Sequence, residues 1–274
     1  MVSGPEVSAN LSEAGRLIGE AVAAGARLVV LPENFAVMPT NDADRLQVME
    51  QNGQGPIQDF LSTQASRHHI WLVGGTIPLE SRESAKVRAA CLVIDDRGQR
   101  VAHYDKLHLF DVNLDNGEQY IESATIEAGE DVVVVDTPLG RLGLAVCYDL
   151  RFPELFRRML DEQAEIFAVP SAFTATTGKA HWEILVRARA IENLAFVVAA
   201  CQGGSHANGR ETYGNSMIVD SWGEVLDRLA HGPGFVIADF DRSRMQAARS
   251  SLPSIEHRRL RYDGNVAGGK KIPV

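Results

Sequence analysis

Hydrophobic residues near the start of the chain alternate between a helical and a strand-like pattern. Asn10 predicts a helix N-cap, and apolar residues follow it at helical spacing until Gly25. Residues 28–31 are then uninterruptedly apolar, which is typical of a short strand buried on both faces. The same unit recurs as a helix that begins at Pro56 and a strand at residues 70–73. Helices and buried strands therefore alternate from the start.

The rest of the chain continues in the same manner. We expect one hairpin between residues 89–95 and 100–105 and a second between residues 132–136 and 142–146. Further elements are expected as a helix that begins at Pro153, a strand at 165–169, a helix at 181–193, strands at 195–201, 213–220, 224–229 and 234–239, and a last helix at 243–249. This order predicts an α/β protein whose helices cover its sheets.

Length and composition are those of one ordinary globular unit. The chain has 274 residues, of which 45% are hydrophobic and 23% charged, and it is too apolar for a disordered protein. No Pro/Gly/Ser-rich linker, charge block or internal repeat divides it. We therefore expect a single domain over residues 1–274.

The charge balance and the apolar runs argue against several partners. The chain has 27 Lys and Arg residues against 36 Asp and Glu residues, a formal net charge of −9, so nothing attracts it as a whole to nucleic acid or to an anionic membrane. The longest apolar run, residues 194–201, is far shorter than the roughly 20 residues that cross a bilayer. Residues 1–6 lack the features of a secretory signal. We expect a cytoplasmic protein that binds neither nucleic acid nor membrane.

Cysteine and histidine spacing indicates neither a metal nor a nucleotide. Cys91, Cys147 and Cys201 are too few and too scattered for a disulfide framework, and no two of them have CxxC spacing. The histidines lack the spacing of zinc ligands, and the chain has no glycine-rich phosphate loop or dinucleotide fingerprint. We expect no metal and no cofactor.

Three reactive side chains, Glu33, Lys106 and Cys147, each follow an apolar strand. Loops at strand ends share one edge of the sheet, where α/β folds gather their sites. Cys147 also precedes the helix start at Pro153, and a helix N-terminus and a nearby cation both lower the pKa of a thiol. Taken singly, these residues are more often inert core, turn or solvated surface. Their combination favours a nucleophilic site.

The segments around these residues resemble the signatures of the nitrilase superfamily of carbon–nitrogen hydrolases, in the same order. They read LPENF at residues 31–35, YDKLHLFD at residues 104–111 and GLAVCYDLRFPE at residues 143–154. The second glutamate of that superfamily matches Glu122 in YIES at residues 120–123. The resemblance extends from the first helix almost to the C-terminus. It implies an α/β fold, a four-layer αββα sandwich, that usually pairs through helices, and therefore a homodimer or higher homo-oligomer.

Three further segments are most similar to the deaminated glutathione amidase branch, and the ω-amidase branch is a close neighbour. They read PSAFT at residues 170–174, TGKAHWE at residues 177–183 and RARAIE at residues 187–192. The resemblance implies an amidase that cleaves the terminal carboxamide of a small α-keto acid and releases ammonia. The implied substrate is deaminated glutathione, preferred over α-ketoglutaramate and strongly over nitriles. An ω-amidase acting on α-ketoglutaramate and an N-carbamoyl amidohydrolase are the alternatives.

The residue types suit amide hydrolysis, which needs a strong nucleophile, a proton for a poor leaving group and stabilisation of an oxyanion. We expect Cys147 to attack the carbonyl and form a thioester, while Glu33 takes the thiol proton and passes it to the departing amine. Lys106 and the backbone N–H of Tyr148 would hold the oxyanion. Glu33 would then activate water against the thioester, and Glu122 would orient Lys106 and the substrate amide.

An anionic substrate needs local cations in a chain of net charge −9. Arg151 is the favoured cation because it is closest in sequence to the nucleophile. Surface Lys and Arg residues are more often solvated than functional, and an aromatic residue here could equally belong to the core. The candidate substrate-binding residues are Arg151, Phe173, Thr174, Lys179 and His181, with Arg210 as a further cation.

Two other interpretations of these residues stay open. A cysteine protease would pair Cys147 with a histidine such as His181 or His206, and sequence position does not exclude that contact. Such an enzyme would depend on that histidine and tolerate Lys106→Arg better than a Glu–Lys–Cys enzyme. A non-catalytic binding protein is the other interpretation, because fold does not imply function. The presence of Glu33, Lys106 and Cys147 together argues against it.

The start of the chain departs from the resemblance. Members of the superfamily normally have a strand before the first helix, but here only residues 1–9 precede Asn10. A missing inner strand would expose a sheet edge. We therefore expect the natural polypeptide to begin upstream of Met1.

Overall fold

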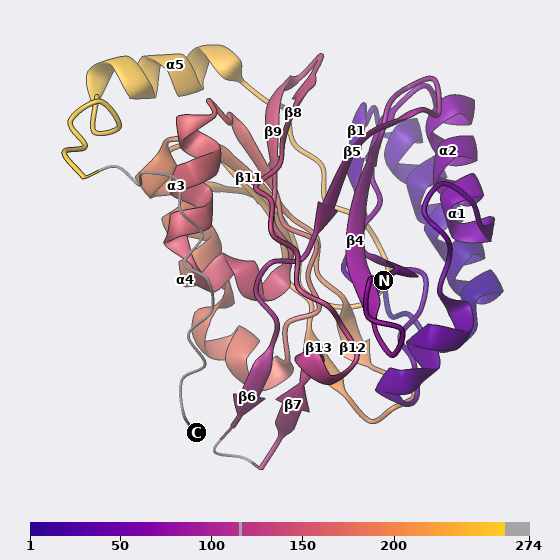
Figure 1. The fold of residues 1–274 in the computed structure, drawn as a ribbon. Coiled ribbons are helices and arrows are strands. Elements are labelled where there is room, and N and C mark those ends of the chain that lie inside the picture. Colours follow the sequence, from indigo (N-terminus) through magenta and orange to yellow (C-terminus); the bar gives the residue numbers. More distant parts are fainter. Residues whose placement is uncertain (115–116, 261–274) are drawn as a thin grey trace.

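Two β-sheets stand face to face, and helices cover the outer face of each (Figure 1). The computed structural model describes residues 1–114 and 117–260. The helices are α1 (Val7–Ala23), α2 (Pro56–His68), α3 (Pro153–Asp161), α4 (Ala175–Asn193) and α5 (Arg242–Ser251). Figure 1 shows α1 and α2 on one side of the sheet pair and α3 and α4 on the other. This is the four-layer αββα sandwich expected from the sequence, in which each sheet buries one face against helices and one against the other sheet.

The first sheet has strand order β1-β2-β4-β3, with β5 also paired to β4. Only β1 and β2 run parallel, and the other pairs are antiparallel. The β4–β5 pair is the first hairpin expected from the sequence. The strands are β1 (Leu28–Val30), β2 (Trp71–Val73), β3 (Ile77–Glu80), β4 (Val87–Ile94) and β5 (Arg100–Asp105).

The second sheet has strand order β15-β14-β11-β10-β9-β8. Its centre is parallel, from β9 through β10 to β11, and the β8–β9 pair is the second expected hairpin. The strands are β8 (Val134–Thr137), β9 (Gly140–Leu144), β10 (Ile166–Ala168), β11 (Phe196–Ala199), β14 (Ser216–Val219) and β15 (Val225–Leu229).

Two small ribbons and three short turns of 3-10 helix lie outside these layers and supply much of the site described below. The ribbons pair β6 (Asp111–Asn113) with β7 (Gln119–Ile121) and β12 (Gly203–Ser205) with β13 (Glu211–Tyr213). The 3-10 turns are η1 (Asp42–Val48), η2 (Glu122–Ala124) and η3 (Cys147–Arg151).

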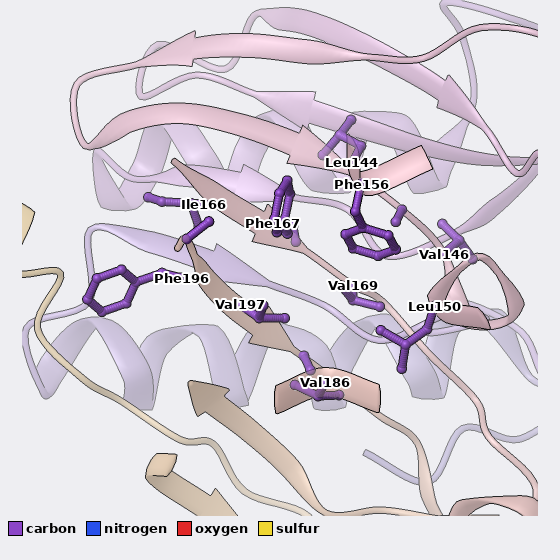
Figure 2. Packing of buried hydrophobic residues seen from close by; sticks show 14 of the residues in the cluster. Leu144, Val146, Leu150, Phe156, Ile166, Phe167, Val169, Val186, Phe196 and Val197 are labelled. Atoms are coloured by element: carbon purple, nitrogen blue, oxygen red, sulfur yellow. The ribbon is translucent and has the colours of Figure 1, made fainter. Parts of the chain in front are cut away.

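Alternate residues of β4 enter two different hydrophobic clusters, because the strand is buried on both faces. Cys91 and Val93 belong to the larger cluster, which also contains the second sheet, whereas Leu92 belongs to the cluster under α1 and α2. Figure 2 shows part of the larger cluster, where Phe167 of β10 meets Phe156 of α3 with ring centroids 5.1 Å apart. Both sheets are thus fixed by apolar packing on two sides.

Several element boundaries differ from those expected. Helix α1 begins at Val7, and Asn10 lies inside it, where its side chain bonds Gly4 and the carbonyl of Ala36 instead of capping. Helix α4 begins at Ala175 because Thr174 caps it by accepting a bond from the N–H of Thr177. The helix starts therefore follow the side-chain hydrogen bonds: Asn10 bonds residues outside the helix and caps nothing, whereas Thr174 bonds the first turn of α4 and caps it.

Two expected strands also differ. The strand expected at residues 213–220 is split, because Gly214 and Asn215 both have positive φ, 67° and 55°. Residues 234–239 form no strand, because they do not pair with a strand of the described residues and the N–H of Ile237 bonds the Asp227 carboxylate instead. A polar side chain here replaces the backbone partner that a strand requires.

The chain start lies beside the edge of the first sheet. Residues 1–6 form no strand, and among the described residues β1 has a strand partner, β2, on one side only. A strand upstream of Met1 stays a prediction. Throughout residues 1–114 and 117–260, no helix combines the length and apolarity needed to cross a membrane.

Candidate active site

The three residues picked out at strand ends meet in one pocket, at one end of the sheet pair. Glu33 follows β1, Lys106 follows β5 directly, and Cys147 follows β9. The first two therefore come from one sheet and the third from the other. Their exposed fractions are 3%, 2% and 7%, so the reacting groups are almost fully removed from water.

Lys106 is held between two carboxylates. Its Nζ donates to Oε1 of Glu33 at 2.8 Å and to both oxygens of Glu122 at 2.9 and 2.8 Å. Glu122 begins η2, directly after β7, and also accepts a bond from the N–H of Phe110 at 2.6 Å. The short β6–β7 ribbon thereby places a carboxylate on the lysine, where the resemblance located it.

The charges of this cluster are mutually stabilised. Burial would raise the pKa of Glu33, but Lys106 outweighs it and holds that pKa below 4.5, the ordinary value for glutamate. Burial would likewise lower the pKa of Lys106, but the carboxylates of Glu122 and Glu33 raise it above its ordinary value. Lys106 is therefore a fixed cation and Glu33 a fixed anion at neutral pH.

Cys147 occupies a sharp turn between β9 and η3. Its φ of 49° is in the left-handed region, which costs a non-glycine residue about 1–2 kcal/mol, and its N–H bonds the carbonyl of Pro170 at 2.9 Å. This turn brings the side chain to the pocket, where the carboxylate of Glu33 is near enough to raise the pKa of the thiol. Strained backbone of this kind is common at reacting residues.

The thiol does not have the lowered pKa that its place before a helix led us to expect. Burial, and then the carboxylate of Glu33, raise the pKa of Cys147 well above 9.0. Lys106 acts in the opposite direction but is itself neutralised by two carboxylates. The turn that follows is a five-residue 3-10 helix and not the first turn of an α-helix. Cys147 is therefore a neutral thiol beside a base.

Asp149 ties the lysine segment to the cysteine turn, and sequence reasoning missed it. This fully buried carboxylate accepts bonds from the hydroxyl of Tyr104 at 2.6 Å and from the N–H of Val146 at 2.8 Å. Its other oxygen accepts the N–H of His108 at 3.0 Å and lies 2.7 Å from Nδ1 of that residue. Tyr104 and His108, which lie on either side of Lys106, are thus bonded to the same carboxylate as Val146, the residue before Cys147. The only signal in the sequence was its place inside the third signature.

Tyr148 is positioned to supply a backbone donor. It is the second residue of η3, and the first N–H groups of a helix have no acceptor within that helix. Its ring lines the pocket and lies edge-on to Phe110 and Phe152, with ring centroids 5.1 and 5.3 Å apart. The N–H next to the nucleophile is where an oxyanion donor is needed.

The structure brings some of the expected substrate-binding residues to the pocket and not others. Arg151, Phe173 and Thr174 line it. Lys179 is exposed and lies outside the lining, because the buried face of α4 passes through Gly178 and Trp182 instead. His181 is also exposed and outside the lining, and it reaches the site only through its Nδ1, 3.2 Å from Nη1 of Arg151.

Two further arginines line the pocket. Arg45 of η1 is paired with Asp42, which lies beside it in the same turn. Arg210, which precedes β13, has its guanidinium 5.2 Å from the ring centre of Tyr120 and donates from Nη2 to the carbonyl of Ala172. The sequence marked Arg210 as a possible cation, whereas Arg45 gave no signal because nothing in the sequence relates η1 to the pocket.

The histidines considered for a cysteine–histidine pair are engaged elsewhere. His206 is buried, with Nδ1 2.9 Å from the carbonyl oxygen of Ser3 and Nε2 2.8 Å from the hydroxyl of Thr212. Burial lowers the pKa of His206. Neither His206 nor His181 lines the pocket, so the base beside Cys147 is Glu33. In residues 1–114 and 117–260, no three His, Cys, Asp or Glu side chains cluster as metal ligands.

Comparison with known proteins identifies the class. The carbon–nitrogen hydrolase family matches residues 3–250, so the chain belongs to that family. The chain is 42% identical over 261 residues to the deaminated glutathione amidase of Synechocystis, an alignment that covers 94% of this chain and 95% of that one.

Solved structures agree with this assignment. The Caenorhabditis elegans NitFhit protein superposes with a TM-score of 0.87 at 37% identity, over 94% of this chain but 63% of that longer chain. Nit3 of Saccharomyces cerevisiae, a nitrilase-superfamily member, gives a TM-score of 0.85 at 30% identity over 94% of this chain and 93% of that one. The superfamily resemblance and the fold expected from it are confirmed.

Proposed function

We propose that this protein is a cysteine-dependent amidase whose substrate is deaminated glutathione. The observation that carries the proposal is one pocket that holds the buried thiol of Cys147 together with the Glu33 carboxylate, which is ion-paired to Lys106 at 2.8 Å. Relatives named for this activity, such as that of Synechocystis at 42% identity, support the choice of substrate.

The first half of the reaction is acyl transfer to sulfur. Glu33 takes the thiol proton as the sulfur of Cys147 bonds the amide carbon, and the carbonyl electron pair moves to oxygen. Lys106 and the N–H of Tyr148 stabilise that oxyanion, a contribution of about 3–4 kcal/mol per donor in comparable sites. The oxyanion then re-forms the carbonyl, the carbon–nitrogen bond breaks, and Glu33 returns the proton to the leaving nitrogen.

The second half hydrolyses the thioester. Glu33, which is again a carboxylate, takes a proton from a water molecule while the oxygen of that water bonds the thioester carbon. Lys106 and the N–H of Tyr148 hold the second oxyanion. The carbon–sulfur bond breaks, and Glu33 protonates the departing thiolate. The lowered pKa of Glu33 and the raised pKa of Cys147 suit this cycle, since it starts and ends with an ionised carboxylate and a neutral thiol.

The leaving group distinguishes the candidate substrates. In deaminated glutathione the amide nitrogen belongs to cysteine, so its hydrolysis yields α-ketoglutarate and cysteinylglycine. The ammonia expected from the sequence would come only from α-ketoglutaramate. Both substrates donate the same α-ketoglutaryl group to Cys147 and differ only in the amine.

The test is turnover of three substrates by the purified protein. We expect kcat/KM to be highest for deaminated glutathione, lower for α-ketoglutaramate and lowest for a simple nitrile, which lacks the carboxylates and the leaving amine. α-Ketoglutarate released from the two keto acids is measured with a coupled dehydrogenase. Equal values for the two would indicate only a general ω-amidase, and a faster nitrile reaction would contradict the amidase.

We also propose that the protein forms a homodimer through the outer face of α4. Ile184 and Ile191 on this helix are 69% and 47% exposed, and Trp222, in the turn after β14, is 57% exposed. Ile191 packs on the turn at Gly223, next to Trp222, and Ile184 lies about two turns before Ile191 on the same helix, so three exposed apolar side chains occur on this side of the molecule. Light scattering of Ile184→Glu should show a monomer, while Val101→Glu, an exposed position on β5, should keep the wild-type mass.

A reducing compartment, such as the cytoplasm, suits this chemistry. All three cysteines are buried and unpaired, and the nucleophilic one must stay reduced to react. The proposal predicts that a mild oxidant abolishes activity and that a thiol reductant restores it. Inactivation without modification of Cys147 would contradict it.

A further inference from the structure

The pocket holds two guanidinium groups that form no ion pair with any carboxylate in the described part of the chain. Among the described residues, Lys106 is paired with Glu33 and Glu122, and Arg45 is paired with Asp42. Arg151 and Arg210 line the same pocket, and neither forms an ion pair in the described part of the chain. Within residues 1–114 and 117–260, two cations in the pocket of Cys147 thus have no carboxylate partner, although the net charge of the protein is −9.

Both guanidinium groups are oriented by contacts with residues that line the pocket. Arg210 lies against Tyr120 and bonds Ala172, and its buried Nε has no partner among the described residues. Arg151 lies between two rings, 5.8 Å from the centre of Tyr148 and 5.3 Å from that of Phe173. An oriented guanidinium with free N–H groups is a ready receptor for a carboxylate.

Both arginines are partly buried, but they contact different parts of the pocket. Arg210 donates to the carbonyl of Ala172, and its charge reaches Glu33, whose pKa it helps to lower. Arg151 has its Nη1 3.2 Å from Nδ1 of His181, which is exposed and lies outside the pocket lining. Arg210 is therefore the cation on the side of Glu33, and Arg151 is the cation on the side of the exposed surface.

We propose that Arg210 binds the α-keto acid carboxylate of the acyl group, and that Arg151 binds the terminal carboxylate of the leaving dipeptide. The assignment rests on the proposed function. The thioester keeps the acyl group on Cys147 until water attacks, so its carboxylate stays beside Arg210, whose charge reaches Glu33. The dipeptide departs first, so its carboxylate is placed at Arg151, which contacts the exposed His181. Selectivity for deaminated glutathione over α-ketoglutaramate then comes from Arg151, because only deaminated glutathione carries a carboxylate on its leaving group.

The test uses the two substrates that share an acyl group. Arg210→Gln should lower kcat/KM for deaminated glutathione and for α-ketoglutaramate alike, by about 10- to 100-fold, the usual effect of losing a hydrogen bond to a charged group. Arg151→Gln should lower it about 10-fold or more for deaminated glutathione and less than about 3-fold for α-ketoglutaramate. Arg210→Lys, which keeps the charge but not the planar fork, should recover part of the loss.

Arg97→Gln is the matched control, because it removes an exposed guanidinium in the β4–β5 turn, outside the pocket lining. It should leave both kcat/KM values at the wild-type level. The thermal unfolding midpoint of each variant shows whether a loss of activity reflects unfolding. The reverse pattern, with Arg151→Gln affecting both substrates and Arg210→Gln only deaminated glutathione, would overturn the assignment, as would equal losses in both arginine variants.

A binding measurement separates this inference from the proposed function. In a Cys147→Ala background, which cannot turn over, calorimetry measures the affinity for α-ketoglutarate, the acid that carries the acyl carboxylate. Arg210→Gln should weaken it by about 10-fold or more, and Arg151→Gln by less than about 3-fold. Wild-type protein that hydrolyses neither keto acid would refute the proposed function. α-Ketoglutarate that binds without dependence on Arg210 would refute this inference even if turnover is as proposed.

Discussion

Cys147 and Cys91 are both buried thiols with raised pKa values, and yet only one of them has the surroundings of a nucleophile. Cys91 lies in the middle of β4, and burial alone raises its pKa. Cys147 is buried nearly as well, but a second cause of its raised pKa is the carboxylate of Glu33. The difference favours the proposal that this site activates sulfur by placing a base next to a neutral thiol and not by stabilising a thiolate in advance.

Removing the nucleophile should have the largest effect. Cys147→Ala should lower kcat by at least about four orders of magnitude, since no other group can form the thioester. Cys91→Ser and Cys201→Ser should keep most of the activity, because neither thiol lines the pocket and burial raises the pKa of Cys201 to about 12. Steady-state kinetics measures this. If Cys147→Ala turned over substrate as fast as the wild-type protein, Cys147 would not be the nucleophile.

Removing the base should have the next largest effect. Glu33→Gln should lower kcat by about 10²- to 10⁴-fold, because the neutral amide cannot accept the thiol proton. Alkylation of Cys147 by iodoacetamide should slow in parallel, and alkylation of Cys91 under denaturing conditions should not change. Peptide mass spectrometry follows both rates. If Cys147 is alkylated as fast without Glu33, the thiol is activated in some other way.

Weakening the link between the two segments should have a smaller effect. Asp149→Asn replaces one acceptor oxygen by an NH₂ donor. That donor would face either the donors of Tyr104 and Val146 or the N–H of His108, so at least one hydrogen bond is lost. We expect kcat to fall about 10-fold with KM little changed, and the unfolding midpoint to fall as well. Asp136→Asn, an exposed carboxylate on β8, is the matched control. A change in KM alone would show that Asp149 does not position the reacting groups.

The pH dependence should be the least pronounced effect. Lys106 holds the pKa of Glu33 below 4.5, so the base is fully ionised at pH 6, and activity should be lost only as pH falls through that lowered pKa. The pKa of Cys147 lies above 9.0, so thiolate formation adds no rise in rate below that pH. We therefore expect kcat/KM to be flat between about pH 6 and pH 9. A bell-shaped profile centred near pH 7 would indicate a histidine or a pre-ionised thiol instead.

The sequence predicted those features that depend on neighbours along the chain. Uninterrupted apolar runs located β1, β2 and β11, and Pro56 located the start of α2. Two of the candidate catalytic residues, Glu33 and Cys147, stood out because each follows such a run. Glu122 follows a three-residue strand with no apolar pattern, and only the resemblance pointed to it.

Features that depend on tertiary contacts could not be predicted. The role of Asp149 arises from bonds to Tyr104 and His108, which lie more than 40 positions away. Lys179 looked like a substrate cation in the sequence, but the rotation of α4 leaves it exposed. The raised pKa of Cys147 could not be predicted because it arises from burial and from the Glu33 carboxylate, which the fold brings to the thiol.

The central claim is that both keto acid amides pass through one acyl group on Cys147. Acid-quenching the reaction during turnover and digesting the protein tests it directly by mass spectrometry. The account predicts that deaminated glutathione and α-ketoglutaramate add the same α-ketoglutaryl mass to the peptide that contains Cys147. Adducts of different mass from the two substrates, or an adduct on the peptide of Cys91 or Cys201 instead, would contradict it.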